Sequence, residues 1–146
     1  MKKNDAIKRL AEIKKEIPEL EKIINSFDPL DVTSYKEVCE KLGDSEITEE
    51  DVKFLPVIER KKAMAKLKIG QLERFYNCGV KPNWSDHSDY KGKHYPYFTI
   101  NGHGRLRFCD STCRYGYFGG AVGLYKDKET SDHVGKHHID IYRDLM

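Results

Sequence analysis

Long apolar runs are missing from this sequence of 146 residues. Apolar residues make up 38% of the chain and charged residues 34%, and no segment approaches the roughly 18 consecutive apolar residues of a membrane-spanning helix. The first residues, 1–5, are mostly polar and charged, and no apolar stretch follows that would make them a secretory signal. We therefore expect a cytoplasmic protein that has no membrane partner.

Cysteine is scarce as well: the chain has four, and only Cys109 and Cys113 lie close together. In a chain without an export signal, we interpret them as thiols and not as a disulfide framework. A zinc site formed with His133 and His137 is the alternative, because residues four apart on a helix are neighbours. Two cysteines four apart on an extended strand lie ~13 Å apart, so one ion could bind both only if residues 110–112 form a tight turn. We predict ordinary side chains here, with no metal and no cofactor.

Motifs of catalysis are also absent. No serine lies in a Gly-x-Ser-x-Gly turn, and the glycines between positions 116 and 123 do not form a Gly-x-Gly-x-x-Gly loop. Cys78 lies beside the predicted end of a helix, where the helix dipole does not favour a thiolate. Asp140 and Asp144 share one side of the last predicted helix and are interpreted as solubility residues. We therefore predict that the protein is not an enzyme.

A heptad pattern, by contrast, is clearly present in residues 4–26. Apolar residues recur there in steps of three and four, and charged residues fill most of the other positions. This pattern predicts a coiled-coil helix of about three heptads, with a kink or a break at Pro18. A lone helix with so narrow an apolar stripe is marginal in water, so it should pair either with a copy of itself or with the helix near residues 57–77. The predicted oligomerisation residues are Leu10, Ile13, Ile17, Leu20 and Ile24.

Charge is distributed in blocks, although the net charge is only +2. Residues 28–51 hold nine acidic and two basic residues, and residues 53–107 hold twelve basic and four acidic ones. The basic block contains a predicted amphipathic helix over residues 57–77. Its basic face is either an ordinary solvated surface or a surface that contacts phosphates. Its predicted apolar side consists of Met64, Leu67, Leu72 and Phe75.

Local signals place the ends of the shorter helical segments. Ser34 followed by Glu37 has the pattern of a capping box, and Gly43 fits the end of the helix that starts there. Thr48 fits the start of the next segment. Residues 77–79, Asn-Cys-Gly, are typical of the end of the basic helix.

The last third, from residue 81, is rich in aromatic residues and interrupted by glycines, which favours a small twisted antiparallel sheet. A hairpin turn is predicted at residues 101–104 and a second turn at residues 119–120. A final helix over residues 131–146, capped by Thr130, Ser131 or Asp132, would cover the sheet. The predicted strands span residues 95–101, 105–111, 114–118 and 121–126. The apolar stripe of the final helix consists of Val134, His138, Ile141 and Leu145.

These elements predict an α+β fold. A helical N-terminal half, made of the heptad helix and the basic amphipathic helix, precedes a small antiparallel sheet of three or four strands with a C-terminal helix. We expect three segments: a coiled-coil-like helix at 1–27, a helical segment at 28–80, and the sheet with its helix at 81–146.

The predicted hairpin offers a further candidate surface. Strand alternation puts Arg105 and Arg107 on one face and their apolar neighbours on the other. Arginines beside aromatic residues could contact phosphates and stack bases. The alternative is that the aromatic face packs under the terminal helix and the arginines are merely exposed. His94 and His103, on either side of the hairpin, are expected to be exposed turn residues.

Several segments in fixed order carry a resemblance. Asn83-Trp84 is followed by residues 93–98 (Lys-His-Tyr-Pro-Tyr-Phe), by the stretch 121–125 and by residues 139–144 (Ile-Asp-Ile-Tyr-Arg-Asp). Together they resemble a group of uncharacterised small proteins encoded by phages, prophages and mobile elements of gut Bacteroides-type bacteria. The resemblance covers residues 33–146 and implies a genomic setting but no particular chemistry. The chain departs from the group's pattern at four places, which are His133, His137, His138 and the pair Cys109–Cys113. These departures argue against a metal site shared by the group.

The sequence thus predicts a non-enzymatic phage or mobile-element accessory protein that binds nucleic acid, DNA or RNA, in the cytoplasm of a bacterial host cell. The alternative is a structural protein, such as a virion component, or a protein-interaction module. That protein would form homo-oligomers through the heptad helix or bind a phage or host protein. The residues predicted to contact phosphates are Lys61, Lys62, Lys66, Lys68, Arg105 and Arg107.

Overall fold

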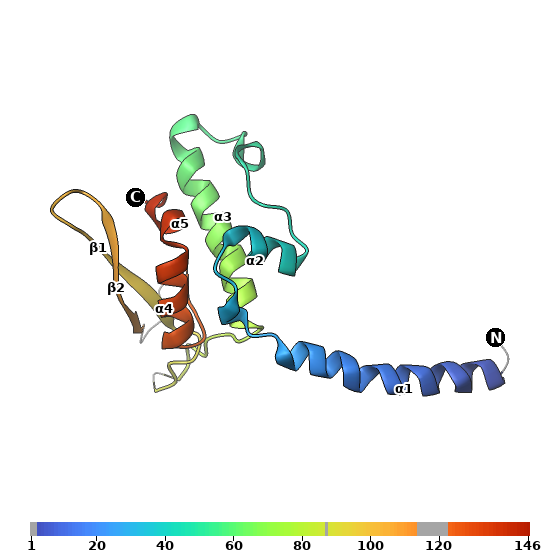
Figure 1. The fold of residues 1–146 in the computed structure, drawn as a ribbon. Coiled ribbons are helices and arrows are strands. Elements are labelled where there is room, and N and C mark those ends of the chain that lie inside the picture. The colour runs from blue at the N-terminus through green and yellow to red at the C-terminus, as the bar shows by residue number, and fades with distance from the viewer. Residues whose placement is uncertain (1–2, 87, 114–122) are drawn as a thin grey trace.

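The computed structural model describes residues 3–86, 88–113 and 123–146. Its architecture is α+β, as predicted, with helices in the first half, then a two-stranded antiparallel hairpin and two short helices (Figure 1). Among the described residues, no helix is both long and apolar enough to cross a membrane. The helices are α1 (Lys3–Ser26), η1 (Pro29–Asp31), α2 (Tyr35–Leu42), η2 (Glu49–Val52), α3 (Val57–Asn77), α4 (Lys128–His137) and α5 (Ile139–Arg143), and the strands are β1 (His94–Ile100) and β2 (Leu106–Cys113).

α1 stands away from the rest of the chain, which we call the body (residues 28–146). It is one continuous helix of 24 residues with Pro18 inside it, and Figure 1 shows it as a gently curved rod. The helix therefore does not break at Pro18, because a proline removes only one backbone donor. The alternative, a kink at this residue, stays a prediction. At the base of α1, the ring of Phe27 packs edge-on against Phe75 of α3, with 5.9 Å between the ring centroids.

The boundaries of the short helices follow the local signals. The Ser34 hydroxyl accepts a hydrogen bond from the backbone N–H of Glu37 at 3.3 Å, which caps α2 as predicted. Gly43 ends α2 with φ +72°, a left-handed conformation that costs a glycine little. Thr48 precedes η2, where its N–H donates to Asp51 at 2.7 Å. These three predictions are confirmed.

α3 is the centre of the body and has the predicted bounds. Its buried apolar side is rotated from the predicted one: Leu67 is 46% exposed and Met64 is half-buried. The rotation arises because α2 packs on one side of α3 and α4 and α5 on another, so the inward positions are fixed by these contacts and not by the helical period alone. The buried apolar residues of α3 are Ala65, Ile69, Leu72, Phe75 and Tyr76.

β1 and β2 form an antiparallel pair in which positions 94 and 113 face each other at one end and positions 100 and 106 at the other. A bulge leaves Cys109 as the extra residue of β2. The predicted turn is confirmed: the Asn101 side-chain oxygen accepts hydrogen bonds from the N–H groups of His103 and Arg105, both at 3.0 Å. Gly104 has φ +73°, the left-handed conformation that this turn requires.

The expected third and fourth strands are not among the described elements. The stretch 114–118 lies outside the described residues, as do the turn at 119–120 and residues 121–122. In the remainder of the predicted strand 121–126, Tyr125 forms a single antiparallel bridge with His94. This segment is held by α3 instead, because the Asn77 side chain bonds Leu124 O and Lys126 N, both at 2.8 Å. Side chains of α3 thus satisfy backbone groups that a sheet partner would otherwise satisfy.

The C-terminal helix starts earlier than predicted and has two parts, α4 and α5, with His138 between them. Asp127 is the N-cap, since its side chain accepts a hydrogen bond from Thr130 N at 2.8 Å. The predicted caps at 130–132 are therefore wrong: these residues lie inside the helix, and an aspartate three residues earlier satisfies the free N–H groups. Val134, His138 and Ile141 of the predicted stripe are buried. The stripe as a whole does not face the sheet as predicted, because His138 contacts Tyr76 of α3, whereas Gly135 and Tyr142 lie against Phe108 and Phe98 of the hairpin.

The body has three layers, with α4 and α5 lying between the hairpin and α3 (Figure 1). The inner face of the hairpin carries Phe98 and Phe108, and Phe98 packs on Tyr142 of α5 with 4.9 Å between the rings. On the other side, Tyr142 and Tyr125 share a hydrogen bond of 2.9 Å in the core. The hydrophobic core therefore joins helices from both halves of the sequence.

Candidate functional site

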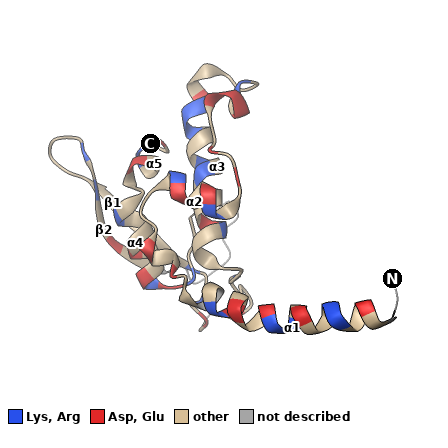
Figure 2. Cartoon of the chain, turned by 45° about the vertical axis from the view of Figure 1, so that its right-hand side comes forward, with Lys and Arg blue, Asp and Glu red and all other residues tan. Residues whose placement is uncertain are grey.

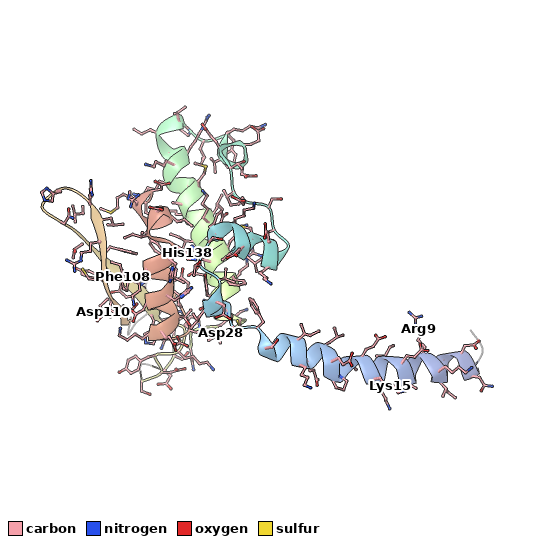
Figure 3. All side chains as sticks on the ribbon, in the orientation of Figure 1. Arg9, Lys15, Asp28, Phe108, Asp110 and His138 are labelled. Carbon is pink, nitrogen blue, oxygen red and sulfur yellow. The ribbon has the colours of Figure 1, made fainter. Side chains whose placement is uncertain are left out.

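An exposed apolar surface runs along the length of α1. Figure 3 shows the α1 side chains projecting from the helix on all sides, away from the body. We call the apolar ones the α1 stripe, and each of its members is between 45% and 66% exposed. The side chain of Ile24, also predicted to mediate oligomerisation, lies outside the described part of the chain. The α1 stripe consists of Ile7, Leu10, Ile13, Ile17, Leu20 and Ile23.

Four of the predicted phosphate-contacting residues lie on α3. Lys62 and Lys66 are exposed, one helical turn apart, and neither has an ion-pair partner among the residues that the structure describes. Lys61 forms an ion pair with Asp144 at 3.1 Å. Lys68 lies over the ring of Tyr35, 5.3 Å from its centroid. Two of the four lysines thus keep their charge available for a ligand.

The other two, Arg105 and Arg107, lie on the hairpin, and α4 and α5 separate the hairpin from α3 (Figure 1). The structure therefore places the six predicted cations in two groups. As predicted, strand alternation separates Arg107 from Phe108, which points inward. The outer face of the hairpin combines Arg107 with Tyr97, which is 52% exposed. Two further aromatic residues of this part of the sequence, Tyr115 and Tyr117, lie outside the described residues.

The acidic block folds back onto the basic helix and partly neutralises it. Figure 2 shows acidic segments beside the upper part of α3. Arg60 donates to Glu49 at 3.1 Å and to two backbone carbonyl groups, and Arg74 forms an ion pair with Asp44. The two charge blocks of the sequence therefore do not form two separate surfaces.

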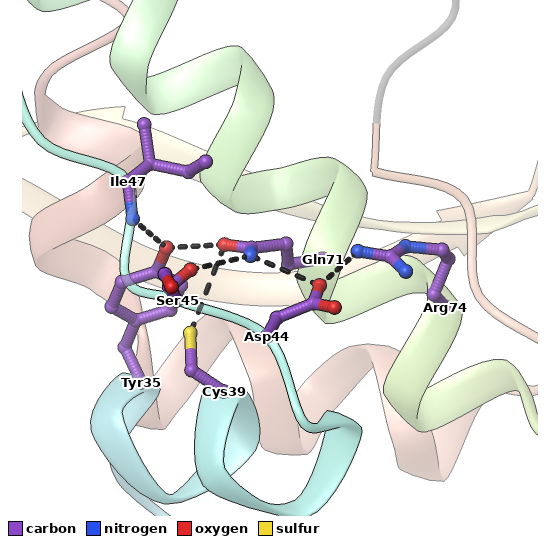
Figure 4. Close-up of polar contacts among 7 residues, drawn as sticks. All are labelled: Tyr35, Cys39, Asp44, Ser45, Ile47, Gln71 and Arg74. Carbon is purple, nitrogen blue, oxygen red and sulfur yellow. Dashed lines mark hydrogen bonds and ion pairs between the residues drawn. The ribbon is translucent and has the colours of Figure 1, made fainter. Parts of the chain in front are cut away.

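A polar network around Gln71 fastens α2 and the following loop to α3 (Figure 4). The Gln71 amide nitrogen donates to Asp44 at 3.1 Å and to Ser45 O at 3.0 Å, while its oxygen accepts a hydrogen bond from the Tyr35 hydroxyl. Burial raises the pKa of Tyr35, and the Gln71 hydrogen bond together with Arg74 lowers the pKa of Asp44. Because the donors and acceptors of this network satisfy one another, we interpret it as a structural clamp.

The three candidate zinc ligands whose side chains are described, Cys109, His133 and His137, do not converge on one site. β2 is a strand as far as Cys113, so the tight turn that one shared ion would require does not form at residues 110–112. Cys109 is exposed, with its sulfur 3.1 Å from the Thr99 hydroxyl, and the side chain of Cys113 lies outside the described part. His133 bonds Val32 O at 2.7 Å, and its ring stacks on that of His137. Within the described residues, no group of three or more potential ligands is placed to hold a metal ion.

His94 differs from its predicted place, whereas His103 is exposed as expected. His94 lies in β1 and is half-buried, and its Nδ1 has no hydrogen-bond partner within the described residues. Burial is the main cause that lowers its pKa. His94 was predicted to lie in a turn, but it belongs to β1 because it pairs with position 113 of β2 and also bridges to Tyr125.

A buried polar contact joins the two halves of the chain at His138. Its Nε2 lies 2.9 Å from the Tyr76 hydroxyl, which also donates to Val32 O at 2.8 Å. Burial, and then the nearby His133 and His137, lower the pKa of His138 to about 4. His138 is therefore neutral at physiological pH. The sequence pattern had identified it only as a member of an apolar stripe, because nothing local reveals its distant partner Tyr76.

We expect His138 to make the fold sensitive to acid. Its pKa is lowered in the folded state, so its contribution to stability is full above the unfolded value of about 6.5 and is lost as the pH falls toward 4. The free energy of unfolding should fall by about 2 kcal/mol between pH 7.5 and 5 through this residue. Urea unfolding of the wild type and of His138→Gln at both values measures this difference. An unchanged pH dependence in the variant would contradict the assignment.

Comparison of the chain with protein-family models, curated proteins and solved structures finds no match. The functional interpretation therefore depends on the surfaces described above.

Proposed function

We propose that this protein is a non-enzymatic assembly module that self-associates through α1. The observation that carries the proposal is the α1 stripe, an apolar surface on a helix that stands away from its own body. An isolated helix of this length is marginal in water unless a partner covers its apolar side. A monomeric protein gains nothing from exposing such a surface.

Among the residues that the structure describes, the body does not cover the α1 stripe. α3, the intramolecular alternative, already buries Ile69, Leu72 and Tyr76 against other parts of the body. α1 approaches it at Phe27, at its C-terminal end. Pairing with another chain therefore accounts for the heptad pattern better than folding back on α3.

Sedimentation equilibrium of the full chain over a range of micromolar concentrations tests this proposal. We expect association that depends on concentration, and a gain in helical circular dichroism as the protein associates, because pairing stabilises α1. A monomer at every concentration, with α1 quickly removed by protease, would contradict the proposal.

Nucleic-acid binding is the second candidate, supported by Lys62 and Lys66. These two exposed lysines border a groove whose other lining residues are Leu55, Ile58, Glu59 and Ala63. Their spacing of one helical turn suits contacts to a phosphate backbone. Phage or mobile-element origin, and a place in the host cytoplasm or the virion, stay predictions that depend on the resemblance alone.

Lys62→Glu/Lys66→Glu is expected to weaken binding of DNA or RNA and to reduce its salt dependence. Two lost phosphate contacts should lower the slope of log affinity against log salt by about 2 for a duplex. Fluorescence anisotropy at low and physiological salt measures both effects. Arg105→Glu/Arg107→Glu makes the same change in charge on the hairpin and tests whether the second group of predicted cations contributes to binding. If neither pair changes binding, or if the wild type does not bind at low salt, this candidate is excluded.

A further inference from the structure

The charges along α1 run against the direction that stabilises a single helix. Residues 3–15 hold five basic and two acidic residues, and residues 16–26 hold three acidic and one basic residue (Figure 2). The helix dipole favours acidic residues in the first turn of a helix and basic ones in the last turn. The first turn of α1 contains Asp5, but the last turn contains no basic residue. The helix dipole therefore does not explain why the basic residues lie in one half of α1 and the acidic residues in the other.

We propose that α1 pairs with α1 of a second copy in antiparallel orientation, with Ile17 of one copy facing Leu20 of the other; this inference rests on the proposed self-association. Antiparallel pairing places the basic half of each helix beside the acidic half of its partner. Parallel pairing would place like charges together along the whole length.

The residues that border the seam lead to the same orientation. In a parallel, in-register pair, Arg9 would face Lys14 of the second copy, and Glu16 would face Glu21, so both pairs would repel. In the antiparallel pair centred between Ile17 and Leu20, Lys14 faces Glu21 of the second copy, and the symmetry of the dimer forms this attractive pair twice. The charges of Arg9, Lys14, Glu16 and Glu21 thus favour the antiparallel orientation.

The same alignment fills the seam with large apolar side chains. Besides the two central contacts between Ile17 and Leu20, Leu10 of each copy comes opposite Phe27 of the other. If the centre of the alignment moved one heptad toward the N-terminus, Ala6 would enter the seam. If it moved half a heptad, Lys14 of one copy would lie against Lys14 of the other. In the favoured alignment the two bodies lie at opposite ends of a helical pair about 27 Å long, because about 18 residues overlap and each rises 1.5 Å.

Charge reversal distinguishes the two orientations. Lys14→Glu and Glu21→Lys should each weaken association of the full chain about tenfold at physiological salt, and the double variant should restore it, because the pair is then attractive again. A parallel dimer predicts the opposite, since either single change would turn a repelling pair into an attracting one. Neither residue has a charged neighbour three or four positions away, so intrahelical ion pairs do not confound the result.

Lys15→Glu is the control, since it makes the same change in charge on the side of α1 away from the seam and should leave association within about twofold. Sedimentation equilibrium measures all four variants. Stronger association of the single variants, or no response to them, would overturn the antiparallel orientation while self-association stands. A wild type that stays monomeric would overturn the proposed function itself, and the orientation with it.

Discussion

Replacing Ile17 with aspartate is expected to convert the associated protein into monomers without loosening the body. In the proposed pair, Ile17 lies at the centre of the seam, so each copy would bring a carboxylate against apolar side chains of the other. Burying an unpaired carboxylate costs several kcal/mol, so association should weaken about a hundredfold or more. Sedimentation equilibrium of Ile17→Asp beside the wild type measures this loss.

Ala11→Asp is the matched control for this experiment. Ala11 lies on the same helix but outside the heptad seam and is exposed, so the substitution introduces the same carboxylate, and its cost in helix propensity is at least as large as that of Ile17→Asp. It should leave the protein associated. Thermal unfolding of the body should be alike in both variants, since Ile17 belongs to the exposed α1 stripe. An Ile17→Asp protein that associates as strongly as Ala11→Asp would exclude α1 as the assembly surface.

The parts of the fold that the sequence predicted are those whose signals are local. The bounds of α3, the cap at Ser34 and the turn at Asn101 depend on residues within a few positions of one another. The bounds of the C-terminal helix were less accurate, because four neighbouring residues can each act as a cap and tertiary packing selects Asp127. Likewise, the helical period allowed several apolar sides for α3, and contacts with distant helices selected the one that excludes Leu67.

For the candidate surfaces, the residue types could be predicted from the sequence, but their partners could not. The sequence located the heptads of α1, and the structure adds that the body leaves their apolar side uncovered. The cations of α3 could be identified from the sequence. That Lys61 pairs with Asp144 and that Lys68 lies over the ring of Tyr35 could not, because both partners come from other parts of the chain. The polar contact of His138 could not be predicted either, because its partner is the hydroxyl of the distant Tyr76.

Gly135→Ala and Gly70→Ala are expected to change stability in opposite directions, although both replace a glycine inside a helix. A Cβ at position 70 would meet no heavy atom within 4 Å, so alanine there should stabilise the protein by up to about 1 kcal/mol through its higher helix propensity. A Cβ at position 135 would overlap the ring of Phe108 and lie 2.9 Å from Cβ of Pro96. We expect Gly135→Ala to cost about 2 kcal/mol, because it overpacks the contact between α4 and the hairpin. Thermal and urea unfolding of both variants measure the two signs.

The contact at Gly135 can be isolated by a double-mutant cycle with Phe108. If the cost of Gly135→Ala arises from the Phe108 ring, the same substitution should cost clearly less in a Phe108→Ala background, where the ring is absent. Residues in contact give coupling energies of about 0.5–3 kcal/mol, well above the error of such measurements. An equal cost in both backgrounds would mean that α4 does not approach the hairpin through this ring.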